Sequence, residues 1–109
     1  MRVDESRCTA AYIMASRRHG TLYTGSALDL IPRVGDHKQG VGSKFVAKYG
    51  VTKLVWFEQF MSEARDREYE IKHWNRDWKV ELIERSNPDW NDLFPVLSGA
   101  ELPRRRSGS

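Results

Sequence analysis

The sequence contains little cysteine and no long apolar run, and each absence excludes a class of protein. Cys8 is the one cysteine among 109 residues, so the chain has no internal disulfide and no cysteine-rich zinc site. No apolar stretch approaches the roughly 18 residues of a membrane span, and residues 1–9 lack the apolar segment of a secretory signal. We therefore expect a cytoplasmic protein in a reducing compartment, with no membrane partner.

Several catalytic signatures are missing as well. The sequence has no His-x-x-x-His or Cys-x-x-Cys pair, so a tetrahedral zinc site is not expected. It also has no glycine-rich dinucleotide loop and no serine nucleophile elbow. What is present is a mildly basic chain, with 18 Lys+Arg against 15 Asp+Glu and a net charge of +3, which permits a polyanionic partner without requiring one.

One folded domain accounts for the length. A chain of 109 residues leaves no room for two domains, and a hydrophobic content of 39% is enough for a core. We expect a flexible N-terminus over residues 1–9, a folded domain over 10–97 and a basic, disordered tail over 98–109, which has no apolar residue after Leu102.

Three segments have the composition of β-strands. Residues 10–15 are mostly apolar, a turn follows at 17–20, and residues 21–24 continue to Gly25, which predicts a hairpin with Gly20 supplying the turn geometry. Because the first strand is apolar on both faces, it should be central in its sheet. Residues 51–58 are rich in β-branched and aromatic side chains and are predicted to form the third strand.

Capping residues mark the predicted helices. Ser26 or Asp29 can cap the first helix, and Pro32 favours Asp29 because proline is tolerated only in a first turn; the helix should run to about Gln39. A helical turn over 44–49, a long helix opening at Ser62, a second helical piece over 77–85 and a capped turn over 87–94 complete the chain. The order β-β-α-β-α-α predicts a mixed α/β fold, a three-stranded sheet with helices packed on it.

Six residues are unusual for purely structural positions: Tyr12, Tyr23, Gly25, Arg33, His37 and Glu68. The tyrosines occupy adjacent strands, the arginine and histidine share one helix face, and the glycine follows a strand where the backbone can approach a ligand. Each also has an ordinary explanation. A strand tyrosine can simply pack its ring, an Arg–His pair can form a solvated face, and the glutamate can pair with Lys72 at i+4.

In this order, the residues resemble the GIY-YIG nuclease superfamily, and most closely its small single-domain bacterial members. The matching phrases are residues 12–16, 20–25, 29–33, 37–38, 48–51, 54–58, 67–68, 71–74 and 87–90. Together they span about residues 10–95, and the ordered set is specific although no single phrase is. The resemblance implies a DNA endonuclease with this α/β fold.

The resemblance implies a place for each hairpin residue. Tyr12 corresponds to the tyrosine of the first motif, where residues 10–11 are Ala-Ala instead of the usual Gly-Ile. Tyr23 and Gly25 match the tyrosine and glycine of the second motif, and Thr24 replaces its usual apolar middle residue.

The helical residues follow in the same way. Arg33 matches the family's helix arginine, His37 its histidine one turn on, and Glu68 its metal-binding glutamate, with Glu70 a less favoured alternative. The family's downstream asparagine stays open between two positions. These are Asn75, which we expect on one helix face with Ala64, Glu68 and Ile71, and Asn87 in the Asn-Pro-Asp-Trp phrase.

These residue types suit phosphodiester hydrolysis. Glu68 can hold one Mg²⁺ or Mn²⁺ ion that keeps most of its waters, and Arg33 can clamp phosphate oxygens in bidentate geometry. We expect a phenolate to form more easily on Tyr12 beside the metal and Arg33, so that Tyr12 takes a proton from water, with His37 or Tyr23 relaying that proton or orienting the phosphate. The prediction is a metal-dependent DNA endonuclease, with a structure-directed role in repair or recombination implied by the superfamily.

Two other functions stay open: a nucleic-acid-binding module that cuts little or not at all, and an enzyme for RNA or small phosphodiesters. Phosphate contacts would come from basic residues, although solubility explains these equally well; they are Arg17, Arg18, Lys38, Lys44, Lys48, Lys53, Lys72 and Arg76. The aromatic residues at 56, 57, 60, 74 and 78 are expected in the core and not as a base-stacking platform. Without a separate DNA-recognition domain, the chain should read DNA structure, form a homodimer or use a protein partner.

Overall fold

Strand β1 (Ala10–Ala15) lies at the centre of the sheet, and all six of its side chains are fully buried. It pairs antiparallel with β2 (Leu22–Ala27) on one side and β3 (Lys53–Gln59) on the other, in the order β2-β1-β3. The structure, a computed structural model, describes residues 10–41, 43–59 and 64–98. The prediction of a central first strand is confirmed. The expected flexible N-terminus over 1–9, the cap Ser62 and Phe60 lie outside the described residues. Of the tail expected over 98–109, residues 99–109 lie outside them too, whereas Ser98 is the last residue of a helix.

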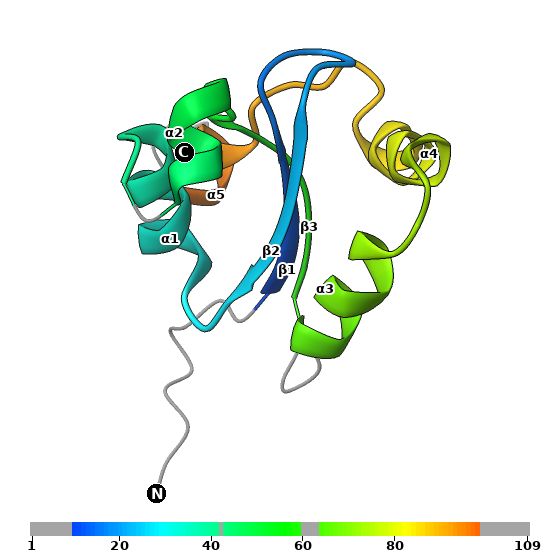
Figure 1. Cartoon of the computed structure of the whole chain (residues 1–109), viewed down its shortest axis with the longest axis horizontal. Coiled ribbons are helices and arrows are strands. Elements are labelled where there is room, and N and C mark those ends of the chain that lie inside the picture. Colours follow the sequence, from blue (N-terminus) through cyan, green and yellow to red (C-terminus); the bar gives the residue numbers. More distant parts are fainter. Residues whose placement is uncertain (1–9, 42, 60–63, 99–109) are drawn as a thin grey trace, which may run out of the picture.

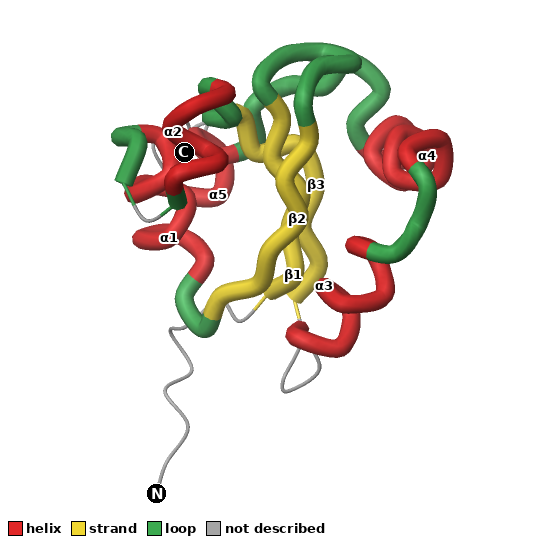
Figure 2. The backbone as a smooth tube through the Cα atoms, viewed as in Figure 1, coloured by secondary structure: helices red, strands yellow, loops and turns green. Residues whose placement is uncertain are grey.

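Helices cover both faces of this sheet (Figure 1). One face carries α1 (Leu30–Lys38), α2 (Lys44–Tyr49) and α5 (Phe94–Ser98), and the opposite face carries α3 (Ala64–Lys72) and α4 (Arg76–Ser86). Figure 2 shows the same three layers, with the strands between the two groups of helices. Among the described residues, no helix is long and apolar enough to cross a membrane.

The period-two alternation of β1 divides the core into two clusters. Tyr12 and Met14 pack with Leu30, Val34 and neighbouring side chains under α1. Ala11, Ile13 and Ala15 pack instead with a second set beneath α3 and α4, which comprises Val55, Trp56, Ile71, Ile83 and Trp90. Alternate residues of β1 therefore pack against the two opposite layers of helices, which is why the strand is apolar on both faces.

A β-bulge in β3 was not predicted from the sequence. Trp56 pairs with Ile13 and Leu54 pairs with Met14, so Val55 is an extra residue between the two pairs. Val55 and Trp56 consequently both face the second cluster.

The hairpin differs from its prediction in two details. Strand β2 continues through Gly25 to Ala27, so Ser26 is a strand residue and not a helix cap. The turn residue with left-handed backbone geometry is His19 (φ 58°) and not Gly20. Position 20 needs glycine for a different reason: a Cβ there would lie 2.3 Å from Ser16 Oγ. Asp29 does occupy the N-cap position of α1, but its side chain makes no capping hydrogen bond.

The short helix α2 confirms the turn predicted over 44–49. Ser43 Oγ accepts a hydrogen bond from the backbone N–H of Val46 at 3.3 Å, and Gly50 ends the helix in the left-handed conformation (φ 63°). The predicted order of strands and main helices is confirmed. The short helix α5 was not predicted: it begins at Phe94, where the predicted turn over 87–94 ends.

The end of α3 corrects one expectation. This helix stops at Lys72, and Asn75 is the N-cap of α4, where its Oδ1 accepts from the N–H of Trp78 at 2.9 Å. Asn75 therefore does not share a helix face with Glu68. Trp78 is 56% exposed, so its expected place in the core is also wrong, whereas Trp56 is 6% exposed.

Candidate active site

The two motif tyrosines meet over Gly25 at the edge of the sheet. Tyr12 in β1 lies directly opposite Gly25 in β2. A Cβ at position 25 would lie 2.7 Å from Tyr12 Oη and 3.0 Å from Tyr23 Cε2, closer than side chains tolerate. Glycine is therefore the residue that allows both phenols to pack against the β2 backbone.

A buried hydrogen bond joins Tyr12 to the first helix. Tyr12 Oη and His37 Nε2 are 2.9 Å apart, and both side chains are fully buried. The ring of Tyr23 contacts His37 edge-on, with centroids 5.3 Å apart, and its centroid is 6.3 Å from that of Tyr12. The structure thus brings together three of the residues singled out in the sequence as one group of rings.

Burial keeps this pair neutral. It raises the pKa of Tyr12 well above its ordinary value, and electrostatic interactions with Tyr23 and Glu68 raise it further, while Arg33 lowers it by charge and by hydrogen bonding. The net rise differs from the expectation that neighbours would make the Tyr12 phenolate easier to form. Burial, followed by the charge of Arg33, lowers the pKa of His37, and Asp36 opposes this. A neutral phenol therefore faces a neutral imidazole at neutral pH.

Glu68 approaches the same edge from the opposite layer. It lies on α3, where its Oε1 accepts a hydrogen bond from Ser26 Oγ at 2.5 Å and its Oε2 lies 2.9 Å from Lys72 Nζ. The predicted i+4 pair with Lys72 is therefore present, and the Glu68 side chain stays 21% exposed. Its charge contributes to the raised pKa of Tyr12, so the carboxylate acts on the phenol across β2.

Arg33 lies one helical turn before His37 on α1 and is exposed. Its charge lowers the pKa of both Tyr12 and His37, which places it electrostatically beside the pair. An exposed guanidinium at this position is accessible to a phosphate.

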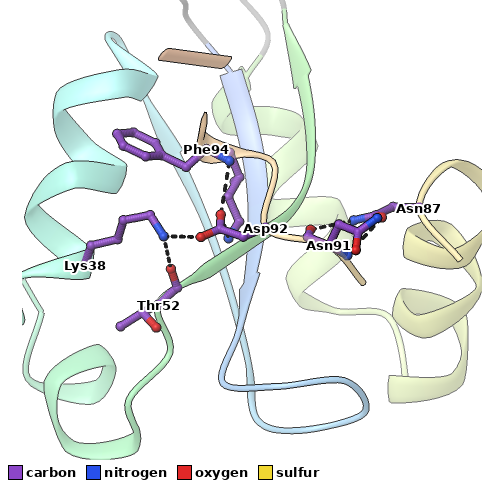
Figure 3. A network of polar contacts seen from close by, with 7 residues as sticks. Lys38, Thr52, Asn87, Asn91, Asp92 and Phe94 are labelled. Carbon is purple, nitrogen blue, oxygen red and sulfur yellow. Dashed lines mark hydrogen bonds and ion pairs between the residues drawn. The ribbon is translucent and has the colours of Figure 1, made fainter. Parts of the chain in front are cut away.

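The asparagine candidates have structural tasks elsewhere. Asn87 is buried, and its Nδ2 donates to the Val55 carbonyl at 3.0 Å. The same Nδ2 donates to the Asn91 carbonyl at 3.0 Å (Figure 3). It secures the β3 backbone to the chain before α5. Glu70, the alternative to Glu68, instead accepts from Arg67 at 2.8 Å.

The basic residues divide into two groups. Lys38 donates to the Thr52 carbonyl at 2.8 Å and to Asp92, which links α1 to β3 and α5 (Figure 3). Arg76 donates to the carbonyls of His19 and Gly20 at 2.8 and 2.7 Å, which ties α4 to the hairpin turn. Of the predicted phosphate-contact residues without a structural role of this kind, Arg17, Arg18, Lys44, Lys48 and Lys72 are exposed, and Lys72 is paired with Glu68.

Glu68 is the residue that would hold a metal ion. The described residues contain no group of three or more His, Cys, Asp or Glu side chains placed to bind one. A single carboxylate fits Mg²⁺ or Mn²⁺ that keeps most of its waters. Each Glu68 oxygen already has one partner but retains a second acceptor position, and Ser26 orients the group. The residues therefore fit one loosely held ion.

Sequence reasoning missed Ser26 and Asp92. The sequence indicates Ser26 only as a possible helix cap, because nothing in it shows that β2 extends past Gly25 toward α3. Asp92 accepts from the N–H groups of Leu54 and Phe94 at 3.2 and 3.0 Å as well as from Lys38. An acidic residue shortly before a helix-starting Phe-Pro pair is a signal for part of that role.

An α/β domain with two tyrosines, an arginine, a histidine and a glutamate at one sheet edge is the arrangement of a GIY-YIG nuclease domain. The family model "GIY-YIG catalytic domain" matches residues 8–81, well over half of the chain. The chain belongs to the GIY-YIG family.

Its relatives include small bacterial proteins. A UPF0213 protein of Staphylococcus saprophyticus is 43% identical over 68 residues, which cover 61% of this chain and 83% of that protein. A UPF0213 protein of Clostridium perfringens is 43% identical over 65 residues, which cover 58% and 70%. The solution NMR structure of a UPF0213 protein from Bacillus halodurans has 30% identity and a TM-score of 0.49, covering 81% of this chain and 95% of that one.

Proposed function

We propose that this protein is a metal-dependent endonuclease that hydrolyses phosphodiester bonds of DNA, directed by DNA structure in repair or recombination. The observation that supports this best is the buried contact of 2.9 Å between Tyr12 Oη and His37 Nε2, at the same sheet edge as Arg33 and Glu68. Any buried phenol needs a hydrogen-bond partner. What supports a catalytic role is that Arg33 and Glu68, one cation and one carboxylate, act on the same phenol.

The Tyr12–His37 pair supplies a route for a proton. Tyr12 Oη is fully buried, so the route requires the ring cluster to open to the attacking water. As that water attacks phosphorus, its proton passes to Tyr12 Oη while the phenol proton passes to His37 Nε2. This route needs the imidazole tautomer with its hydrogen on Nδ1, and no acceptor within the described part of the chain fixes that tautomer. The lowered pKa of His37 keeps the imidazole neutral before the reaction and ready to accept.

The charged residues handle the phosphate. Arg33 clamps the non-bridging oxygens, whose charge grows as water adds to phosphorus. A Mg²⁺ or Mn²⁺ ion, when bound, supplies further charge stabilisation at the phosphate. Ser26 orients Glu68, and Lys72 offsets its negative charge. The leaving oxygen departs with the electron pair of the broken P–O bond and takes a proton from solvent.

Cleavage assays test the proposal. Supercoiled, branched and single-stranded DNA are incubated with Mg²⁺ or Mn²⁺ and with wild type, Tyr12→Phe, Glu68→Gln or Glu81→Gln. Glu81 is the matched control, because it also has a cation at i+4 (Arg85, 3.6 Å) but lies on an exposed face with its side chain 70% exposed. We expect wild type and Glu81→Gln to cut, and the other two variants to lose activity while remaining folded. Salt-sensitive binding without cleavage by wild type would favour a binding module instead.

A further inference from the structure

Helix α2 exposes two aromatic rings directly beside the candidate active site. Phe45 is 42% exposed and Tyr49 is 47% exposed, and their ring centroids are 4.8 Å apart. The Phe45 ring also lies 6.1 Å from that of Tyr23. Ring contacts therefore continue from the buried Tyr12 through Tyr23 and Phe45 to the surface at Tyr49.

Packing of α2 does not require these rings. The buried residue of the helix is Val46, and Ser43 and Gly50 fix its two ends. Two large apolar side chains are therefore held at the surface by a helix whose attachment depends on other residues. Adjacent exposed rings of this kind indicate a contact surface for a ligand.

The surrounding charge points to a polyanion. Residues 38–53 contain four lysines and no acidic residue, and three of these lysines remain when Lys38, which is paired with Asp92, is set aside. Lys44 and Lys48 are exposed on α2 itself, and Lys48 Nζ lies 5.3 Å from the centre of the Tyr49 ring. Exposed rings interleaved with cations are what proteins use to bind single-stranded nucleic acid, stacking bases on the rings while the cations contact phosphates.

We infer that Phe45 and Tyr49 form a stacking platform for unpaired bases, so that the favoured substrate is single-stranded or locally unpaired DNA. The inference rests on the proposed function, which places the scissile phosphate at Tyr12, whose ring centroid lies 6.3 Å from that of Tyr23. A paired duplex stacks its base faces on one another and presents only base edges in its grooves. It therefore cannot use this platform, whereas an unpaired strand can.

The platform is tested by binding and not by cleavage. A fluorescent single strand of about 12 nucleotides, its duplex and an abasic strand of equal length are titrated, without metal, against Glu68→Gln protein. The same protein carrying Phe45→Leu and Tyr49→Leu keeps apolar bulk but loses the ring faces. Tyr69→Leu is the matched control, because Tyr69 is 68% exposed and its ring lies 4.2 Å from that of His73.

We expect the double substitution to weaken single-strand binding by about tenfold or more, and duplex and abasic binding by less than about twofold. Tyr69→Leu should bind all three probes as Glu68→Gln does. Circular dichroism establishes that each variant is folded.

Three results would contradict the proposed stacking platform. The double substitution could leave single-strand binding unchanged, or it could weaken binding of the abasic strand equally. The third result is a protein that is dimeric in sedimentation and becomes monomeric on the double substitution. The last result would identify the rings as an interface between copies of this chain. The two proposals can also fail separately. If the wild-type protein cuts no DNA but binds single strands through these rings, the proposed function is wrong and the platform is supported.

Discussion

The two halves of the candidate active site differ in burial and in charge. On the α1 side, Tyr12 and His37 are fully buried and neutral. On the α3 side, Glu68 is partly exposed, charged and paired with Lys72 and Ser26. Burial suits groups that must hold neutral protons and pass them on, whereas partial exposure suits a carboxylate that must exchange one cation for another.

Two neighbouring residues of β2 connect the halves. Successive side chains of a strand point to opposite faces of the sheet. Gly25 therefore lies against the Tyr12 phenol, and Ser26 bonds the Glu68 carboxylate. A change at either residue should damage one half and leave the other half largely intact, which makes the comparison testable.

The largest effect is expected from Tyr12→Phe. Loss of the phenol oxygen interrupts the proton route, so single-turnover cleavage should fall by about 10²- to 10⁴-fold. His37 Nε2 also loses its partner, at a cost of about 1–3 kcal/mol in the free energy of unfolding. Quench-flow cleavage and urea denaturation measure the two effects. Tyr69→Phe removes an exposed hydroxyl and should change neither; near-normal cleavage by Tyr12→Phe would exclude the proton route.

The second largest effect on cleavage is expected from Gly25→Ala. The added methyl group would meet Tyr12 Oη and Cζ at 2.7 and 2.8 Å, so the phenol must shift away from His37. Overpacking of this kind lowers the free energy of unfolding by about 1–3 kcal/mol. We also expect slower cleavage, because the phenol leaves its place beside His37. Gly35→Ala is the control, because nothing lies within 4 Å of its added Cβ in α1. In Gly35→Ala, thermal unfolding should show that the free energy of unfolding rises by about 0.5–1 kcal/mol.

Ser26→Ala should affect the α3 side alone. Without the hydroxyl, Glu68 loses the group that orients it, so Mn²⁺ affinity should fall by about 10- to 100-fold. Electron paramagnetic resonance of bound Mn²⁺ measures this without DNA. The pKa of Tyr12, followed by its ultraviolet absorbance, should stay raised. Unchanged Mn²⁺ affinity would show that Ser26 does not position the carboxylate.

The smallest effect is a pH dependence that belongs to the α1 side. Because the pKa of folded His37 lies below the unfolded value of 6.5, the unfolded chain binds more protons as pH falls below that value. The stabilisation is complete above about pH 6.5 and is lost as pH falls through the folded pKa. Urea titrations should show a shallower acid loss in His37→Gln than in wild type; equal slopes would mean that His37 does not titrate on unfolding.

Much of the fold could be predicted from local patterns. The apolar run at 10–15, the cap at Asp29 and the ends of α2 at Ser43 and Gly50 depend on neighbouring residues, which the sequence displays directly. The bulge at Val55 and the end of α3 at Lys72 depend on tertiary packing, which the sequence does not display.

The candidate site divides in the same way. Its main residues could be picked out in order along the chain, and the structure brings Tyr12, Tyr23 and His37 together. The direction of the Tyr12 pKa shift could not be predicted, because it depends on how deeply the phenol is buried. The role of Ser26 could not either, because it requires β2 to lie beside α3 across 42 positions of sequence.

The most direct test of one site built from two halves is a double-mutant cycle in single-turnover DNA cleavage, comparing Tyr12→Phe, Glu68→Gln and the combined variant with wild type. If both halves act on one phosphate, the combined variant should be about as slow as the slower single variant. Rate losses that multiply, or cleavage that survives both substitutions, would contradict the account.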